Sequence, residues 1–199
     1  MSSSNITKTV LANSLKELLK KNPLQKISVK DITEYCSISR NAFYYHFKDK
    51  YDLINWIFYN DVLKNINTFQ QPEKLADSFV QLCKSLHKER AFYLDCFQYK
   101  EQNSLYEVLH ECYYELWKMN LDMYSREHSI LLCEERLDAM ASLNTYSLIG
   151  IIYDWVKNGM NSDYLSYFEQ IKNIWNMDFF PMYTPYAPET LETLLAKQA

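Results

Sequence analysis

Two short helix patterns separated by a tight turn, between Ser28 and Leu53, constrain the fold more than any other part of the chain. Ser28 is a favourable N-cap residue, and Asp31 can reach back to it as in a capping box. Ser39, which follows the turn, can cap a second helix. The buried face of the first helix is expected to consist of Val29, Ile32 and Cys36. The turn is too short for the two helices to pack parallel, so the pattern predicts a helix-turn-helix.

The second helix should have a buried side and an open side. Phe43 and Phe47 lie four residues apart and are expected to enter the core. The side left open consists of Arg40, Asn41, Tyr44, Tyr45 and His46. In a major groove Arg can bond guanine and Asn can bond adenine, and Tyr hydroxyl groups suit phosphate oxygens. The open side therefore has the chemistry of a DNA-reading surface.

Two plainer interpretations of this helix stay open. Taken alone, a Tyr-rich helical segment can simply be amphipathic core. His46 could equally be a partly buried histidine at a helix C-terminus. The ordered succession of cap, helix, turn, cap and polar-faced helix favours DNA binding.

The stretch resembles the N-terminal DNA-binding head of the TetR family of transcriptional regulators. The matching letters are SVKDI at 28–32, IS at 38–39, YYHF at 44–47 and DK at 49–50, followed by Leu53. Before the turn, Tyr35-Cys36-Ser37 replaces the family's usual Ala-Ala-Gly, so Ser37 is expected to adopt a backbone conformation that favours glycine. The sequence YYHFKDKYDL at 44–53 also resembles the firmicutes-type branch of the family, which includes regulators of dihydroxyacetone kinase operons.

The resemblance implies roles for particular parts of the chain. The implied DNA contacts are Lys30, Ser39, Arg40, Asn41, Tyr44, Tyr45, His46 and Lys50. Among them, Lys30 and Lys50 would contact phosphates. The resemblance also implies a body that binds a small-molecule effector and dimerises through its last two helices.

Composition and length set the expected fold class. The chain has 199 residues but only two Gly and five Pro, which argues for long helices and against a turn-rich β protein. We expect an all-α protein with a three-helix N-terminal helix-turn-helix head and a C-terminal helical body for effector binding and dimerisation. The expected boundaries are 6–66 for the head, with its helix-turn-helix at 28–47, 72–180 for the body, and 181–199 for a tail without an assigned function.

The formal net charge of −4 is unevenly distributed. Through Asp52 the chain has nine Lys or Arg and five Asp or Glu, a balance of +4; the remainder has twelve and twenty, a balance of −8. A basic head on an acidic body attracts DNA at one end of the molecule only. No apolar run approaches the roughly 18 to 20 residues that span a bilayer, and no signal-peptide pattern is present, so a cytoplasmic protein without a membrane partner is expected.

Helical periodicity continues through the body. A fourth helix should begin at Lys50 and run to about Phe69, joining the head to the body. The further expected helices are 73–87, 91–99, 104–124, 130–158 and 164–177. Gly159 is expected to end the longest of them as its C′ residue.

Two groups of apolar residues in the body have both a functional and a plainer interpretation. The expected wall of an effector pocket is Phe92, Tyr93, Phe97, Tyr106, Tyr113, Tyr114 and Trp117. The expected dimer contacts are Leu148, Ile152, Trp155, Phe168, Ile171 and Trp175. An aromatic stripe at helical spacing can equally be plain core. The last two helices could likewise only close the monomer's own core, although residues 143–156 are apolar on more than one side and need partners on two faces.

Catalytic and metal-binding patterns are weak. Glu107 and His110 form one E-x-x-H motif, whereas a di-iron bundle needs two. A regulatory zinc site that uses His110, Cys112 or His128 stays open. The five cysteines contain no C-x-x-C pair, and the chain has no nucleophile elbow and no phosphate-binding Gly loop. We therefore expect no enzyme, no cofactor, no disulfide framework and no metal.

The sequence thus predicts a regulator of transcription. We expect a repressor that binds a palindromic double-stranded DNA operator as a homodimer and is released by an unknown small-molecule effector. The alternative is a coactivator or protein-interaction module that keeps the fold but acts through another regulator. An enzyme with a helical active site is a more remote possibility.

Overall fold

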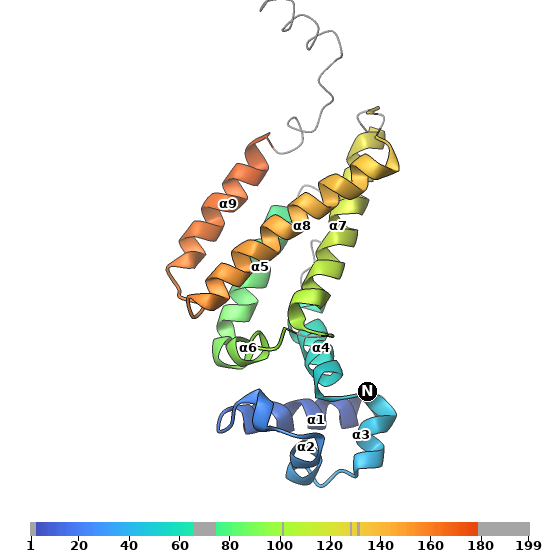
Figure 1. The fold of residues 1–199 in the computed structure, drawn as a ribbon, viewed down its shortest axis with the longest axis vertical. Helices are drawn as coiled ribbons and strands as arrows, with labels where there is room; N and C mark the ends of the chain where they lie inside the picture. Colours follow the sequence, from blue (N-terminus) through green and yellow to red (C-terminus); the bar gives the residue numbers. More distant parts are fainter. Residues whose placement is uncertain (1–2, 66–74, 101, 128, 131, 179–199) are drawn as a thin grey trace, which may run out of the picture.

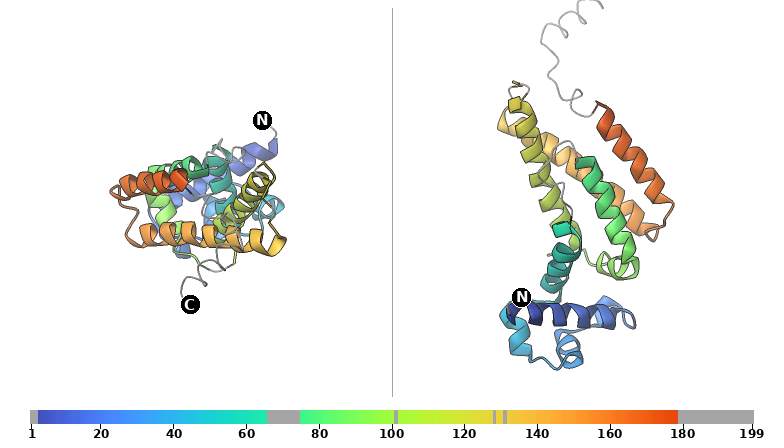
Figure 2. Two further views of the ribbon diagram at one scale, coloured as in Figure 1. Left: turned by 90° about the horizontal axis from the view of Figure 1, so that it is seen from above. Right: turned by 180° about the vertical axis from the view of Figure 1, so that it is seen from behind.

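The computed structural model describes residues 3–65, 75–100, 102–127, 129–130 and 132–178. These residues form nine α-helices, two short 3-10 helices and no β-strand, so the all-α prediction is confirmed (Figure 1). The first three α-helices gather at one end of an elongated molecule, and α4 leads from them to the remaining helices (Figures 1 and 2). We call residues 3–65 the head and residues 75–178 the body. The bounds are α1 (Ser3–Leu19), η1 (Leu24–Lys26), α2 (Val29–Tyr35), α3 (Arg40–His46), α4 (Lys50–Asp61), η2 (Leu63–Asn65), α5 (Leu75–Lys88), α6 (Arg90–Cys96), α7 (Leu105–Glu127), α8 (Glu134–Lys157) and α9 (Tyr164–Asp178).

The helix-turn-helix begins with the caps that the sequence predicts. The Ser28 N–H donates to the Asp31 carboxylate (2.8 Å), and the Asp31 N–H donates to Ser28 Oγ (3.3 Å), which completes the capping box of α2. Ser39 Oγ accepts a hydrogen bond from the Ala42 N–H (3.1 Å) and caps α3. Both helices therefore satisfy backbone donors that their first turns would leave unpaired.

The turn between α2 and α3 places Ser37 in the left-handed region, with φ of 54°. The Ile38 N–H donates to the Thr33 carbonyl (3.0 Å) across it, as in the Schellman motif that often closes a helix. The expectation that Ser37 adopts a glycine-like conformation is confirmed. Its side chain makes this conformation cost on the order of 1 kcal/mol.

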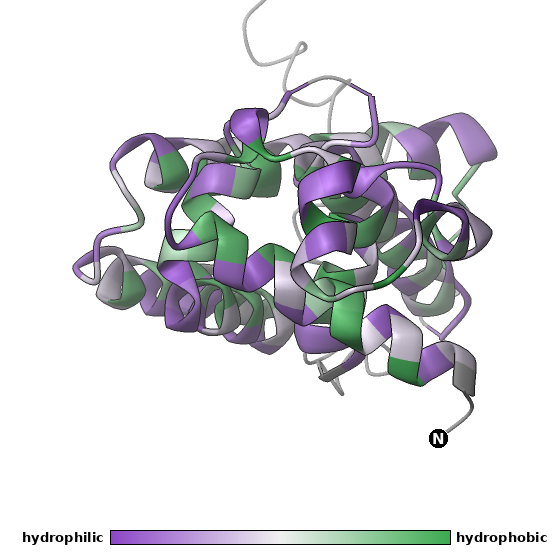
Figure 3. Ribbon diagram, turned by 90° about the horizontal axis from the view of Figure 1, so that it is seen from below, coloured by the Kyte–Doolittle hydropathy of each residue, from purple (hydrophilic) through white to green (hydrophobic). Residues whose placement is uncertain are grey.

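Beneath these caps lies the head's part of an apolar core that continues into the body. α1 packs against α2, α3 and α4, and each helix seen from below carries hydrophilic and hydrophobic residues side by side (Figure 3). The buried side chains of this core include Leu11, Leu15, Leu24, Ile32, Phe43, Phe47 and Leu53. The predicted burial of Phe43 and Phe47 is confirmed, so the opposite side of α3 is left open.

The connection from head to body differs from the expectation. α4 ends at Asp61, not near Phe69: Val62 is its C-cap residue, and the short η2 begins at Leu63. The expected domain boundary near residues 66–72 and the tail at 181–199 lie outside the described residues.

The body is built from two helix pairs, α7 with α8 and α5 with α9. α8 begins at Glu134 and not at residue 130, because Cys133 has extended backbone geometry at its N-cap and α7 reaches Glu127. Its end is as predicted: Gly159 has φ of 74°, and the Met160 N–H donates to the Trp155 carbonyl (2.8 Å). None of the helices in the described ranges is long and apolar enough to cross a membrane.

Candidate nucleic-acid interface

The open side of α3 faces outward. Arg40, Asn41, Tyr44 and Tyr45 are all exposed, and Tyr45 retains 83% of its accessible surface. Ser39 is also exposed, although its hydroxyl already serves as the helix cap. These side chains project from a helix that its buried face holds firmly, so hydrogen-bonding groups for base edges and phosphates lie together on one surface.

His46 lies at the border of this surface and is half-buried. Its ring packs edge-on against Tyr45, with centroids 4.9 Å apart, and tilts against Phe47 at 6.3 Å. The imidazole of His46 therefore packs against the Tyr45 ring, and part of the imidazole remains accessible to solvent.

The two lysines expected to contact phosphates are placed differently. Lys30 is exposed, with its ammonium 3.6 Å from Glu34 across one turn of α2. Lys50 instead donates to the carbonyls of Leu24 and Ile27, both at 2.7 Å, and so holds the linker that precedes α2. Burial lowers the pKa of Lys50, against the opposing influence of nearby carboxylates.

Lys48 is a candidate that the sequence reasoning missed. It is exposed in the turn between α3 and α4, and its N–H donates to the Asp52 carboxylate (2.9 Å), which fixes the backbone and leaves the ammonium to solvent. The signal was present in the sequence, since Lys48 directly follows the buried Phe47 at the end of α3.

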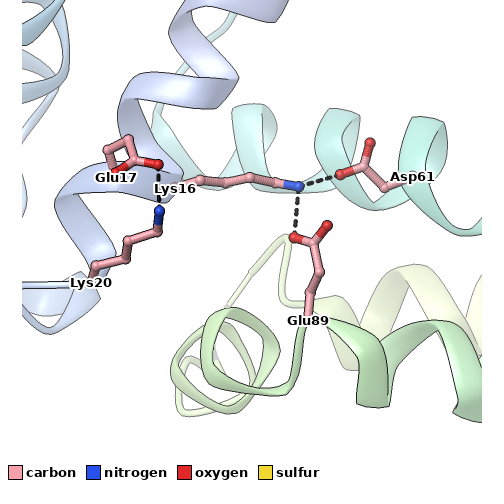
Figure 4. Close-up of polar contacts among 5 residues, drawn as sticks. All are labelled: Lys16, Glu17, Lys20, Asp61 and Glu89. Atoms are coloured by element: carbon pink, nitrogen blue, oxygen red, sulfur yellow. Dashed lines mark hydrogen bonds and ion pairs between the residues drawn. The ribbon is translucent and has the colours of Figure 1, made fainter.

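The head is joined to the body by polar and aromatic contacts. Lys16 of α1 lies 2.5 Å from the Asp61 carboxylate of α4 and 2.7 Å from the Glu89 carboxylate, between α5 and α6 (Figure 4). Burial opposes its charge, but the hydrogen bonds that Lys16 donates to these two carboxylates, together with their negative charge, outweigh burial and raise the pKa of Lys16. Two further links are a hydrogen bond from the Leu24 N–H to Asp95 (2.8 Å) and the stacked rings of Tyr51 and Tyr99, 3.6 Å apart.

The seven aromatic residues expected to line an effector pocket occupy several places. Five of them are buried: Phe92, Tyr93, Phe97, Tyr113 and Trp117. The other two, Tyr106 and Tyr114, are half-buried, and the Tyr114 hydroxyl donates to Asp138 (2.8 Å). The Tyr93 hydroxyl is buried with no hydrogen-bond partner in the described structure, and burial raises its pKa. Most of these seven aromatic residues therefore lie inside the body, where the hydroxyl of Tyr93 could accept or donate a further hydrogen bond.

The residues expected to contact a second copy are also interior. Leu148, Ile152, Trp155 and Phe168 are fully buried within the single chain, and Ile171 is 8% exposed. The Trp155 indole donates to the Asn161 carbonyl (3.0 Å) and packs edge-on against Phe168. The side chain of Trp175 lies outside the described residues. In this conformation the five described residues close the monomer's own core, which was the plainer of the two interpretations.

A different stripe of α8 is exposed. It consists of Ala139, Leu143, Tyr146, Gly150 and Tyr153. The spacing alternates between four and three residues, which places these positions along one face of the helix. We call this set the α8 stripe.

The E-x-x-H motif is engaged in local contacts. The Glu107 carboxylate accepts a hydrogen bond from the Asn103 N–H (2.6 Å), and the His110 ring stacks on Tyr114 at 6.2 Å. Cys112 is half-buried, and burial raises the pKa of its thiol. His128 lies outside the described residues, among which no three His, Cys, Asp or Glu side chains are grouped to hold a metal ion.

The chain is similar to known proteins over both of its parts. A family model described as bacterial regulatory proteins, tetR family, matches residues 14–57. A second model, described as transcriptional regulator C-terminal region, matches residues 73–177. The first match contains the helix-turn-helix, and the second contains nearly all of the body.

A curated relative is also a regulator of transcription. The HTH-type dhaKLM operon transcriptional activator DhaS of Lactococcus lactis subsp. lactis (strain IL1403) is 32% identical over 97 residues, 49% of this chain and 52% of that protein. The match thus spans about half the length of this relative.

Solved structures share the fold at lower identity. The structure of the dihydroxyacetone kinase operon activator DhaS has a TM-score of 0.57 at 22% identity and covers 85% of this chain and 95% of its own. NalD of Pseudomonas aeruginosa, the secondary repressor of the MexAB-OprM multidrug efflux pump, has a TM-score of 0.57 at 16% identity, covering 85% of this chain and 96% of its own. Both family models describe regulators of transcription and not enzymes, and together they cover head and body: the chain belongs to the TetR family of bacterial transcriptional regulators.

Proposed function

We propose that this regulator binds a palindromic operator in the cytoplasm as a homodimer and represses transcription until a small-molecule effector releases it. The observation that carries the proposal is the outward face of α3, where Arg40, Asn41 and Tyr44 are exposed above a buried face. A recognition helix of this kind enters the major groove, and two copies must meet half-sites about 34 to 36 Å apart. The basic balance of the head supports this orientation on DNA.

The α8 stripe is the surface that would join the two copies. It is apolar or small at every position, and spacing of four and three is the pattern of helices that pack along their length. At Gly150 an added Cβ would have no atom within 4 Å in the single chain, so two backbones can approach closely there. This replaces the buried residues of α8 and α9 as the proposed contact.

The effector would bind in the aromatic interior of the body. Tyr93 offers a buried hydroxyl that has no partner in the described structure, next to α4, where its ring lies 6.1 Å from Phe58. An effector that bonds this hydroxyl can favour one arrangement of body and head. Coupling of this kind typically amounts to about 1 to 3 kcal/mol, or roughly 5- to 150-fold in operator affinity.

A second candidate is activation in place of repression. It is favoured by the relative in Lactococcus lactis, which bears the name of a transcriptional activator. A reporter gene behind the chain's own promoter separates the two: deletion of the regulator raises expression under repression and lowers it under activation. A coactivator that works through another regulator would change expression without binding this DNA on its own.

The DNA flanking the regulator's own gene tests the proposal directly. Fluorescence anisotropy should detect binding of the purified protein to an inverted repeat, with an affinity that falls steeply between 50 and 200 mM salt, as counterion release requires. Arg40→Ala should cost about 1 to 3 kcal/mol on the operator and less on random DNA. Arg126→Ala is the matched control, because Arg126 is exposed on the body and pairs with Asp122 on the same helix. Equal losses for both variants, or no preference for a repeat, would refute the proposed role of α3.

A further inference from the structure

A groove follows the seam where α1 of the head meets α6 of the body. Two adjoining hollows form it, of about 700 and 570 Å³, within the range of small-molecule sites in proteins. They share Leu19, Ala91 and Leu94. The larger hollow reaches the junction of α5 and α6, and the smaller one continues to the end of α8 at Lys157. We call these two hollows together the α1–α6 groove.

Of the six Lys and Arg side chains that line the groove, Lys16 and Lys20 have carboxylate partners and four have none among the described residues. Lys88 and Arg90 line the larger hollow, and Lys21 and Lys157 line the smaller one. None of these four takes part in an ion pair within the described ranges. Most other basic residues described in the acidic body do have carboxylate partners, as Lys84 has in Glu169.

The carboxylates that line the groove are already engaged. Glu17 accepts from Lys20 (2.5 Å), and Glu89 accepts from Lys16 (2.7 Å). Asp95 accepts from the backbone N–H of Leu24 (2.8 Å). The positive charge of the unpaired side chains is therefore not neutralised inside the groove, which favours an anion from solution.

The shared wall of the groove is apolar, and one of its cations is held in place. Leu19 and Leu94 are half-buried, and Ala91 is exposed. Arg90 donates through Nε to the Gly159 carbonyl, which anchors the guanidinium to the end of α8. The terminal nitrogens of an anchored guanidinium can bond a carboxylate with little loss of side-chain freedom.

From this arrangement we propose that the α1–α6 groove binds a small organic anion, a carboxylate that carries an apolar tail. Lys88 and Arg90 bind the carboxylate group of this anion. Its apolar tail packs against Leu19, Ala91 and Leu94. The groove borders the aromatic interior of the body at Phe92, which lines the larger hollow, and it contains none of the residues of the DNA surface. Because its walls belong to both head and body, a bound anion stabilises the arrangement of the two that the structure shows.

Calorimetric titration of the full chain with octanoate, in the absence of DNA, tests the site independently of operator binding. We expect one molecule per chain with a dissociation constant on the order of 0.1 to 1 mM, as a ligand of about ten heavy atoms allows. Octan-1-ol should bind at least about tenfold more weakly, because it lacks the charge. No detectable octanoate binding, or equal binding of the alcohol, would overturn the proposal.

Substitutions place the binding in the groove. Lys88→Gln and Arg90→Gln should each weaken octanoate about tenfold, whereas Lys84→Gln, one turn earlier on α5 and outside the groove, should leave it unchanged. Ala91→Glu puts a carboxylate on the exposed position shared by both hollows and should abolish binding, with Ala91→Gln as its uncharged control. Wild-type affinity in Lys88→Gln and Ala91→Glu would put octanoate elsewhere in the molecule and refute the assignment.

Discussion

At the scale of single residues, Lys50 joins α4 to the segment that precedes α2. Its ammonium bonds the carbonyls of Leu24 and Ile27, two residues whose side chains are buried. Lys50→Met should therefore destabilise the fold by about 1 to 3 kcal/mol, because both carbonyls lose a charged donor. Lys48→Met should leave stability within about 0.5 kcal/mol and weaken binding to all DNA alike. Thermal denaturation and DNA titration of both variants check this.

The opposite pattern would have a clear meaning. If Lys50→Met kept its stability but lost DNA affinity, and Lys48→Met lost neither, the phosphate contact would belong to Lys50 as the family resemblance implies. The ammonium would then have to leave the two carbonyls when DNA binds.

The capping box gives a prediction on pH. Hydrogen bonds from the Ser28 hydroxyl and the Ser28 N–H lower the pKa of Asp31. A carboxyl whose pKa is lower in the folded state stabilises the fold above its unfolded value near 3.8, and this contribution is lost as pH falls through the folded value. The melting temperature of the wild type should exceed that of Asp31→Asn at pH 7, and the gap should narrow as the pH falls below 3.8. A gap that stays constant between pH 7 and pH 3 would mean that the charge of Asp31 does not contribute.

At the scale of elements, α8 shows what a sequence can and cannot reveal. Residues 143–156 are apolar on two sides, and periodicity alone cannot say which side packs inside the chain. The side with the larger apolar residues, Leu148, Ile152 and Trp155, is buried, and the side with Leu143, Tyr146 and Gly150 is exposed.

The caps of α2 and α3 were predictable because they depend on residues three positions apart.

The bonds of Lys50 could not be predicted in this way, because they join α4 to carbonyls more than twenty residues earlier in the chain. The same limit applies to the partners of Lys16, which lie 45 and 73 residues away. Local rules therefore located the recognition helix and its open face, whereas the packing between elements decided which lysine stays free.

The α8 stripe leads to a prediction about assembly. Gly150→Glu should keep the monomer folded, because an added Cβ at this exposed position has no atom within 4 Å and glycine is a poor residue within a helix. In a symmetric pair the substitution brings two carboxylates together, so the variant should be mainly monomeric by light scattering at concentrations where the wild type is dimeric. Met119→Glu, which replaces an exposed apolar residue of α7, is the control and should remain dimeric. A dimeric Gly150→Glu would place the interface on another surface.

At the scale of the whole molecule, a basic head and an acidic body meet through few polar contacts, and Lys16 is central among them. Its side chain is 22% exposed and bonds carboxylates from two other parts of the chain, Asp61 and Glu89. Ion pairs in such partly buried surroundings are screened less by salt than surface pairs. If the effector proposed above shifts α6, Lys16 would transmit that shift to α1 and so to α3.

Lys16→Met should lower the free energy of unfolding by about 1 to 2 kcal/mol, since it leaves two carboxylates close together without their cation. Lys20→Met on the same helix should change it by less than about 0.5 kcal/mol, because its pair with Glu17 is exposed.

The raised pKa of Lys16 means that its contribution to stability is present below the unfolded pKa of 10.5 and is lost at higher pH, as the ammonium deprotonates in the folded state. A double-mutant cycle of Lys16→Met with Glu89→Gln, followed by urea denaturation, should give a coupling energy of about 1 kcal/mol at pH 7. If that coupling is absent while the variants remain folded, Lys16 does not link head and body, and the shift of α6 must reach the recognition helix through the contacts of Asp95 and Tyr99.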